Sequence, residues 1–354
     1  MFNKVSIKEK MLFAQHLSLL IKGERPLFEA LKVLRNETKS GTFKKVLNGI
    51  LNRVSEGISL NQSLRAYPQI FDKFFCNVVK VGEVSGTLSE NLKYLSQYLR
   101  NQYLLQKKIV LALIYPLLIL ILTFFLILLL LLFVLPKIIG LFRALQVELP
   151  WATRVLINTS IFLKNNGIKL IVIFLFLFLV FKLLNRNRII KFYSHKLLLS
   201  LPALGKVSMN VNLARFSRTF YTLFKSGVPV LEALEVCQEV LQNAVYKERL
   251  KRIQYEVERG ERLSEALKKF PDIFPPIFAQ MILVGEKGGT LEESLRYLAE
   301  FYEEEVDSAV KNLSGLIEPF LLILVGVVVA FVVLSIITPI YRLVGNLSHL
   351  PKIH

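Results

Sequence analysis

The residues of this 354-residue chain whose types and spacing could support chemistry form a short motif, G-E-x-x-G-T-L, that occurs twice. The copies lie at Gly82–Leu88 and Gly285–Leu291, and the second carries a lysine. A glycine-rich turn before a helix can hold a phosphate with its backbone amides. A P-loop requires the spacing G-x-x-x-x-G-K-[ST], however, and no stretch of the chain has it. The sequence therefore predicts no nucleotide site, and we expect no cofactor.

A structural role accounts for the motif without any ligand. Thr87 and Glu90 have the T-x-x-E form of a helix capping box, and the second copy repeats it. The glycines permit a left-handed turn between two packed helices, so valine at Gly82 or Gly285 is expected to destabilise the chain through this turn. The alternative is a loop that docks a partner protein and uses the acids as exposed contacts. The candidate residues for these two roles are Gly82, Glu83, Gly86, Thr87, Gly285, Glu286, Gly289 and Thr290.

One carboxylate lies inside an apolar segment of the chain. Glu318 follows Lys311 by seven residues, which is about 10 Å along a helix. An ionisable group at that depth in a membrane is a functional candidate by default, although close to the membrane surface it can also reach water or a lysine. Pro319 follows it, and Pro116 has the equivalent place in an earlier apolar segment, where proline kinks or loosens a helix. The candidate intramembrane residues are Pro116, Glu318 and Pro319.

No catalytic or metal-binding set can be assigned from the sequence, and we do not expect an enzyme. Cys76 and Cys237 are far apart and belong to no C-x-x-C motif. The acidic run at 303–307 is more typical of a solvated helix face than of a metal site. The histidines have no metal-ligand spacing; they are His16, His195, His349 and His354.

Long apolar segments are the elements that must position these residues. The chain is 53% hydrophobic, and its mean hydropathy of +0.48 argues against a purely soluble protein. Residues 111–135 contain no charged residue, and residues 313–340 contain one, so both exceed the roughly 20 apolar residues that a spanning helix needs. Residues 168–184 are a shorter candidate. The sequence predicts two spans and a third, shorter one.

The net charge is +18, from 45 Lys and Arg against 27 Asp and Glu. Strong basicity can indicate nucleic-acid binding. Here the basic residues beside the apolar segments fit the positive-inside rule, which places these flanks in the cytoplasm against anionic lipid, so we expect no nucleic acid as a partner. The flanking residues are Lys107, Lys108, Arg186, Arg188, Lys191 and Lys311.

The sequence contains an internal repeat, shifted by 203 residues. It pairs Pro26 with Pro229 and the first copy of the motif with the second, and it needs no gap from Phe13 to Pro136. A register kept over this length indicates a duplication. Each copy comprises a polar module and the apolar segment that follows it, so two tandem copies need one additional span to return the chain to the same side of the membrane. The segment at 168–184 supplies that span.

The resulting topology has both modules in the cytoplasm and the N-terminus inside. The modules are predicted to be helical because apolar residues recur at helical spacing, as at Phe13, Leu17 and Leu20. The predicted fold is an all-α membrane protein with two homologous cytoplasmic helical-bundle modules of about six helices each and three transmembrane helices. The expected segments are module 1 at 1–110, a span at 111–135, an external loop at 136–167, a span at 168–184, module 2 at 185–312, a span at 313–340 and a short external tail at 341–354.

The duplicated pattern resembles a known family, the inner-membrane platform protein of type II secretion and type IV pilus machines (protein F, or PilC-like). The resemblance covers nearly the whole chain. It rests on Gly227-x-Pro229, on Phe270-Pro271, on the two G-E-x-x-G-T-L motifs, on Glu318-Pro319 in the last apolar segment and on Leu201-Pro202-x-Leu204-Gly205 before the second module.

This resemblance implies a non-enzymatic scaffold for protein transport. Such a protein couples a cytoplasmic hexameric assembly ATPase to polymerisation of pilin or pseudopilin, and its partners are the ATPase, the pilin transmembrane helices, other inner-membrane platform proteins, further copies of itself and membrane lipid. Two other functions stay open: an oligomeric transporter or channel, and a membrane-tethered basic module that binds DNA or lipid. A lone intramembrane acid and repeats of one orientation make the transporter the weaker hypothesis.

Overall fold

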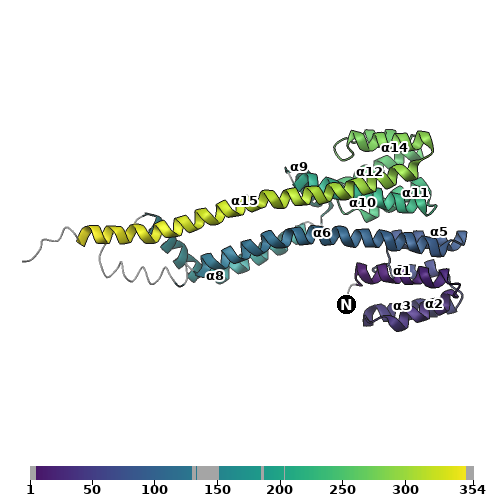
Figure 1. Ribbon diagram of the computed structural model, residues 1–354, viewed down its shortest axis with the longest axis horizontal. Helices are drawn as coiled ribbons and strands as arrows, with labels where there is room; N and C mark the ends of the chain where they lie inside the picture. The colour runs from purple at the N-terminus through teal and green to yellow at the C-terminus, as the bar shows by residue number, and fades with distance from the viewer. Residues whose placement is uncertain (1–4, 130–132, 134–150, 185–186, 203, 348–354) are drawn as a thin grey trace, which may run out of the picture. The chain divides into compact units, whose positions relative to one another are not determined.

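The structure is a computed structural model that describes residues 5–129, 133, 151–184, 187–202 and 204–347. Over these residues the secondary structure is helical, without strands (Figure 1). The helices are α1 (Ile7–Lys22), α2 (Leu27–Glu37), α3 (Gly41–Ser55), α4 (Leu60–Arg65), α5 (Lys73–Ser85), α6 (Leu88–Leu129), α8 (Trp151–Leu184), α9 (Arg188–Ser200), α10 (Leu204–Lys225), α11 (Val230–Val240), α12 (Ala244–Glu258), α13 (Leu263–Lys268), α14 (Pro276–Gly288) and α15 (Leu291–Leu347).

The duplication is visible in the helix bounds. Helices α11 to α14 begin and end 203 residues after α2 to α5, and α15 begins 203 residues after α6. Helix α10 ends at the position equivalent to the end of α1 and is longer only at its N-terminus. The predicted all-α fold with two homologous repeats of six helices is therefore confirmed.

Local sequence signals set the helix ends. Ser6 and Glu9 form a complete capping box at α1, and the Asp72 side chain accepts the N–H of Phe75 at the start of α5. Pro26 immediately precedes α2, where its fixed φ is compatible with a helix start and its missing N–H is not needed. Gly57 has φ +83°, a conformation that favours glycine, and lies two residues past the end of α3.

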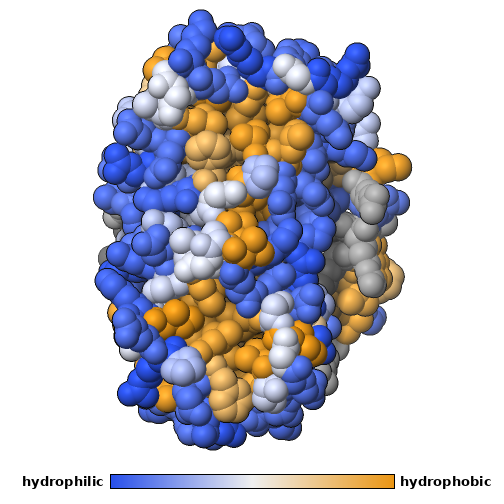
Figure 2. Space-filling view, turned by 90° about the vertical axis from the view of Figure 1, so that its right-hand side faces the viewer, coloured by the Kyte–Doolittle hydropathy of each residue, from blue (hydrophilic) through white to orange (hydrophobic). Residues whose placement is uncertain are grey.

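The described residues cluster into two units: Met1–Ile109 with Lys191–Val310, and Val110–Ile190 with Lys311–His354. We call residues 1–109 module 1 and residues 191–310 module 2. Figure 2 views one end of the molecule, where hydrophobic areas lie within a mainly hydrophilic surface. On this side of the molecule, the apolar areas lie toward the upper and the lower end of the view.

The two modules have the same aromatic core. In module 1, Phe13 packs against Phe43 and Phe71 with ring centroids 5.8 Å apart in both pairs. In module 2, Phe216 lies 5.3 Å from Phe274 and 5.9 Å from Phe278. The core rings of module 2 occupy positions 203 residues after those of module 1, in the pairs Phe13 and Phe216, Phe43 and Tyr246, Phe71 and Phe274, and Phe75 and Phe278.

One difference in these cores concerns a backbone carbonyl. In module 2 the Tyr246 hydroxyl donates to the carbonyl of Ile273 over 2.9 Å. In module 1 the equivalent carbonyl, that of Ile70, accepts instead from Lys10 Nζ over 3.1 Å. Both carbonyls are therefore satisfied, by side chains from different positions of the repeat.

Among the described residues, one helix is long and apolar enough to cross a membrane, and a bent pair could be counted as a second. The first is α6, in which the predicted span at 111–135 begins; residues 130–132 and 134–135 lie outside the described residues. The bent pair joins α9 to α10 at an angle of 111°. Many side chains of α10 are buried in module 2, among them Phe216 and Phe220, so we interpret α10 as a core helix.

The predicted count of three spans is therefore not confirmed. In α15 the apolar stretch Pro319–Phe331 is shorter than a span requires. Residues 151–167 form the first half of α8, and their sequence contains no helix-breaking proline. Their assignment to an external loop concerns the side of the membrane on which they lie, and it stays a prediction. Residues 341–347 of the predicted tail likewise continue α15.

Candidate functional site

The two motifs form the turns that join α5 to α6 and α14 to α15. Gly86 has φ +72° and Gly289 has φ +69°, both in the left-handed region that favours glycine. The Thr290 N–H donates to the carbonyl of Gly285 over 2.9 Å and closes the second turn. The predicted left-handed turn is therefore present in both copies.

Gly82 and Gly285 have a different role, which corrects our expectation for their substitution. Both are buried within helices, one turn before the left-handed glycines. A Cβ atom on Gly82 would lie 2.9 Å from the Cα of Leu88, and one on Gly285 would lie 3.0 Å from the Cα of Leu291. Such distances are shorter than ordinary van der Waals contact. Valine would therefore destabilise the chain by separating two packed helices, and not by forcing the turn.

The motif acids bind the N-termini of two short helices. The Glu83 carboxylate accepts the N–H of Leu60 over 2.6 Å and that of Asn61 over 2.8 Å, at the start of α4. The Glu286 carboxylate accepts the N–H of Leu263 over 2.8 Å and that of Ser264 over 3.1 Å, at the start of α13.

These carboxylates have a favourable electrostatic position, since the unpaired amides of a helix N-terminus carry partial positive charge. Both glutamates are half-buried, and both oxygens of each are used inside their module. The structure thus gives Glu83 and Glu286 an internal role, whereas the alternative interpretation made them exposed contacts. Sequence reasoning missed this role because the bonds join residues 22 or 23 positions apart, although the second copy repeats the spacing.

The capping boxes predicted at Thr87 and Thr290 do not form among the described residues. The Thr87 hydroxyl instead hydrogen-bonds the Ser85 hydroxyl over 2.6 Å, which removes it from the amides of α6. The residues of the two turns that remain exposed are Val84, Ser85, Gly86 and Thr87 in the first and Lys287, Gly288, Gly289 and Thr290 in the second.

The proposed intramembrane residues lie in helices that continue past them. Pro116 is inside α6, which runs on to Leu129 without ending at the proline, and Pro319 is exposed in α15. Glu318 is part of α15, and its side chain lies outside the described residues.

Three acids of the run at 303–307 pair with basic side chains while staying partly exposed to solvent. Glu303 receives two hydrogen bonds from Arg218, each of 2.8 Å, and the Arg218 side chain is largely buried. Glu305 lies 3.9 Å from Lys206. Asp307 lies 3.0 Å from Lys108. The bases come from α10 and α6, which the sequence alone does not place next to α15.

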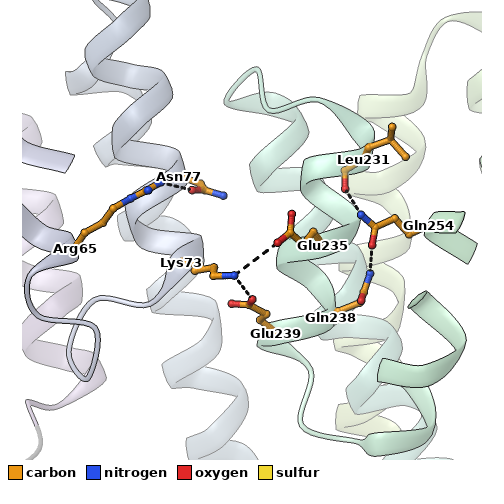
Figure 3. Close-up of polar contacts among 8 residues, drawn as sticks. All are labelled: Arg65, Lys73, Asn77, Leu231, Glu235, Gln238, Glu239 and Gln254. Atoms are coloured by element: carbon orange, nitrogen blue, oxygen red, sulfur yellow. Dashed lines mark hydrogen bonds and ion pairs between the residues drawn. The ribbon is translucent and has the colours of Figure 1, made fainter. Parts of the chain in front are cut away.

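The two modules contact each other through α5 and α6 on one side and α10 and α11 on the other. Lys73 forms ion pairs with Glu235, at 3.6 Å, and with Glu239 (Figure 3). The hydroxyls of Tyr98 and Thr219 are 3.3 Å apart and buried, and this burial raises the pKa of Tyr98. This module interface was not predicted, because it depends on tertiary placement.

The cysteines and the potential metal ligands are two further kinds of reactive side chain. Cys76 and Cys237 are free and buried, and burial raises the pKa of the Cys76 thiol to about 11. In the part of the chain that the structure describes, no group of three or more His, Cys, Asp or Glu side chains is placed to hold a metal ion.

The fold and its turns define a class of protein: a duplicated helical bundle in which each repeat continues into an apolar helix. A family model described as type II secretion system (T2SS), protein F matches residues 13–136 and again residues 216–339. These two matches have the same offset of 203 residues as the repeat. The chain belongs to this family.

Curated relatives have names from two kinds of machine. The chain is 32% identical over 344 residues to the type IV pilus assembly protein PilC of Pseudomonas aeruginosa. This alignment covers 97% of this chain and 91% of that protein. It is 30% identical to the PilC of Thermus thermophilus, covering 97% and 84% of the two chains. It is 31% identical to the type II secretion system protein F of Vibrio cholerae, with the same coverage.

Proposed function

We propose that this chain is a non-enzymatic inner-membrane platform protein of a type IV pilus or type II secretion machine. It couples a cytoplasmic hexameric assembly ATPase to the polymerisation of pilin or pseudopilin. The names of the relatives support a place in such a machine. In this proposal both modules lie in the cytoplasm, three spans cross the membrane, and the partners include the pilin transmembrane helices, other platform proteins and further copies of the chain.

The observation that carries the proposal is the continuity of α6. It is one helix of 42 residues, about 63 Å long, and it joins the end of module 1 to the apolar residues after 110. A bilayer core is about 30 Å thick, so the helix is long enough to cross it and still extend into the bundle. A displacement of module 1 by an ATPase would therefore be transmitted directly to the membrane segment, where a pilin helix would be moved.

The exposed residues of the two turns are the proposed ATPase contacts. Glu83 and Glu286 hold the turns in place from inside each module, which leaves side chains such as Val84 and Lys287 free to face a partner. Pro116 and Pro319 would adjust the membrane helices against the pilin, and Glu318 is the acid available there. The basic flanks would bind anionic lipid headgroups.

The test is crosslinking of the full chain in its native cells, followed by affinity purification and mass spectrometry. We expect an assembly ATPase and a pilin-like protein among the captured partners, and we expect Val84→Asp or Lys287→Asp to reduce capture of the ATPase. The matched control is Tyr255→Asp, at an exposed position of α12 outside the two motifs. Capture of neither partner, under conditions that recover an unrelated membrane complex, would refute the proposal.

A further inference from the structure

The module interface buries a face of module 1 whose equivalent in module 2 is exposed. Phe74, on α5, is 2% exposed, whereas the equivalent Ile277, on α14, is 59% exposed. Tyr98, on α6, is 6% exposed, whereas the equivalent Phe301, on α15, is 38% exposed. Tyr297 and Val284 on the same two helices are exposed as well. We call Ile277, Val284, Tyr297 and Phe301 the α14–α15 face.

The opposite side of the interface shows the reverse difference. Thr219 and Thr222 of α10 are buried, and the Thr219 hydroxyl lies 3.3 Å from that of Tyr98 in module 1, while the equivalent residues of α1, His16 and Leu19, are exposed. We call His16, Leu19, Lys22 and Glu24 the α1 face. Module 1 thus uses α5 and α6 in the internal contact and leaves the α1 face without a partner among the described residues. Module 2 uses α10 and leaves the α14–α15 face without one.

The contact between the modules is heterologous, because α5 and α6 of module 1 meet the equivalents of α1 and α2 in module 2. A heterologous contact does not satisfy both faces of a repeated unit, so it can be repeated from one molecule to the next. The free α14–α15 face of one copy and the free α1 face of another are the repeat equivalents of the two surfaces that already pack inside the chain.

The free faces keep part of the chemistry of the internal contact. Inside the chain the Lys225 ammonium lies 4.9 Å from the centroid of the Tyr94 ring. The equivalent residues are Lys22, on the α1 face, and Tyr297, on the α14–α15 face, so the cation–π pair can form again. The ion pairs of Lys73 cannot, because its equivalent is Pro276.

Charge complementarity also favours this pairing. Glu300 and Glu304 are exposed on α15 beside Tyr297 and Phe301, at helical spacing. The groove between α1 and α6, next to the α1 face, is lined by more basic side chains than acidic ones. The charged residues of this groove are Lys22, Lys93, Arg100 and Glu90.

We propose that the α14–α15 face of one copy docks on the α1 face of module 1 in a second copy, and so repeats the module interface between molecules. This docking names the surfaces for the self-association that is part of the proposed function. It rests on that proposal, in which the modules of all copies lie on the same side of the membrane. Without the Lys73 ion pairs, the contact between copies is weaker than the internal one.

A disulfide between two differently tagged copies tests the arrangement. Inside the chain, a Cβ atom on Gly227 would lie 3.5 Å from Cγ1 of Val81, which is close to the approach that a disulfide needs. The equivalents of these residues are Glu24 and Val284. We therefore expect Glu24→Cys on one full-length copy and Val284→Cys on the other to crosslink in membranes under mild oxidation. The native cysteines are buried, which limits the background.

The control pairs Glu24→Cys with Tyr255→Cys, because Tyr255 is 55% exposed and Val284 is 53% exposed in the same module. We expect at least a tenfold higher yield of the doubly tagged product for the first pair, and a loss of that product when Phe301→Asp is added. Equal yields for the two pairs would overturn the docking arrangement. The capture of the ATPase and pilin by the unmodified chain is measured separately, so a failure here does not depend on the proposed function.

Discussion

In module 2, Arg218 and Glu303 form a two-bond ion pair between α10 and α15, whereas the equivalent residues of module 1, Gln15 and Arg100, line a groove between α1 and α6. The helix bounds and the aromatic cores of the modules are nevertheless equivalent. The difference teaches that helix packing was retained after the duplication while polar pairs diverged. Packing depends on volume at each core position, but a polar pair requires two matched side chains.

The largest effect is expected from Glu303→Gln. The Arg218 guanidinium is nearly buried, and this change removes its counter-charge. We expect a loss of about 3 kcal/mol in the free energy of unfolding, since the pair is partly buried. The unit that both modules form should melt about 6 to 12 °C lower in detergent, as measured by differential scanning fluorimetry. Arg100→Gln, at the equivalent exposed position of module 1, is the control and should change stability by less than about 0.5 kcal/mol. Equal shifts in melting temperature for the two variants would show that the Arg218–Glu303 pair does not stabilise module 2 specifically.

Gly82→Val tests a feature that the modules share. Because the added side chain would meet the backbone of Leu88, we expect a loss of about 2 to 3 kcal/mol, and a similar loss for Gly285→Val in module 2. The measurement is the resistance of each module to limited proteolysis of the purified chain. Gly41→Val is the matched control, since a Cβ atom there meets nothing within 4 Å. A tolerated Gly82→Val with a sensitive Gly285→Val would mean that the helix contacts differ between modules.

Glu83→Ala and Glu286→Ala should each cost about 2 kcal/mol, because two backbone amides lose a charged acceptor at a helix N-terminus. Hydrogen exchange measured by mass spectrometry should show faster exchange at the first residues of α4 or α13. The control is Glu90→Ala, which removes an exposed acid nearby. Unchanged protection of α4 would contradict the internal role of Glu83.

The smallest effect concerns pH and module 2 alone. His195 Nδ1 accepts the N–H of Ala244 at the start of α12, over 2.9 Å. Burial and the nearby Lys191 lower the pKa of His195. The hydrogen bond from Ala244 to neutral His195 therefore stabilises the folded state above pH 6.5, the ordinary histidine pKa. This stabilisation is lost as the pH falls through the pKa of His195 in the folded state.

Acidification should therefore loosen the start of α12 in the unmodified chain by less than about 1 kcal/mol. Hydrogen exchange of α12, corrected for the intrinsic effect of pH, measures this change. His195→Gln provides the control, since its side chain does not titrate and its exchange should not respond in the same range. Helix α3, the equivalent in module 1, gives an internal reference, and an equal response there would exclude His195 as the cause.

Much of the fold could be predicted from sequence periodicity. The repeat, the six helices per module and the left-handed turns follow from local signals such as Gly86, Gly289 and the apolar spacing at Phe13. The length and composition of the apolar segments indicated the membrane character, although their number is not confirmed.

The polar contacts could not be predicted in the same way. Glu83 binds α4 across 23 residues, and Arg218 binds Glu303 across 85, so neither pair is visible as a local pattern. The module interface involves Lys73 and Glu239, which are 166 residues apart. The repeat offers one usable signal, since a polar residue present at both positions, such as Glu83 and Glu286, indicates a shared structural role.

The two core carbonyls described above have an evolutionary consequence. Module 1 combines Lys10 with Phe43, and module 2 combines Leu213 with Tyr246 at the equivalent positions. Changing Lys10 to leucine first would leave the Ile70 carbonyl without this donor, whereas gaining the tyrosine hydroxyl first would give the carbonyl two donors. A change from the lysine donor to the tyrosine donor is therefore easiest through an intermediate that has both. The position of Lys10 and that of Phe43 should then covary as a pair among related sequences.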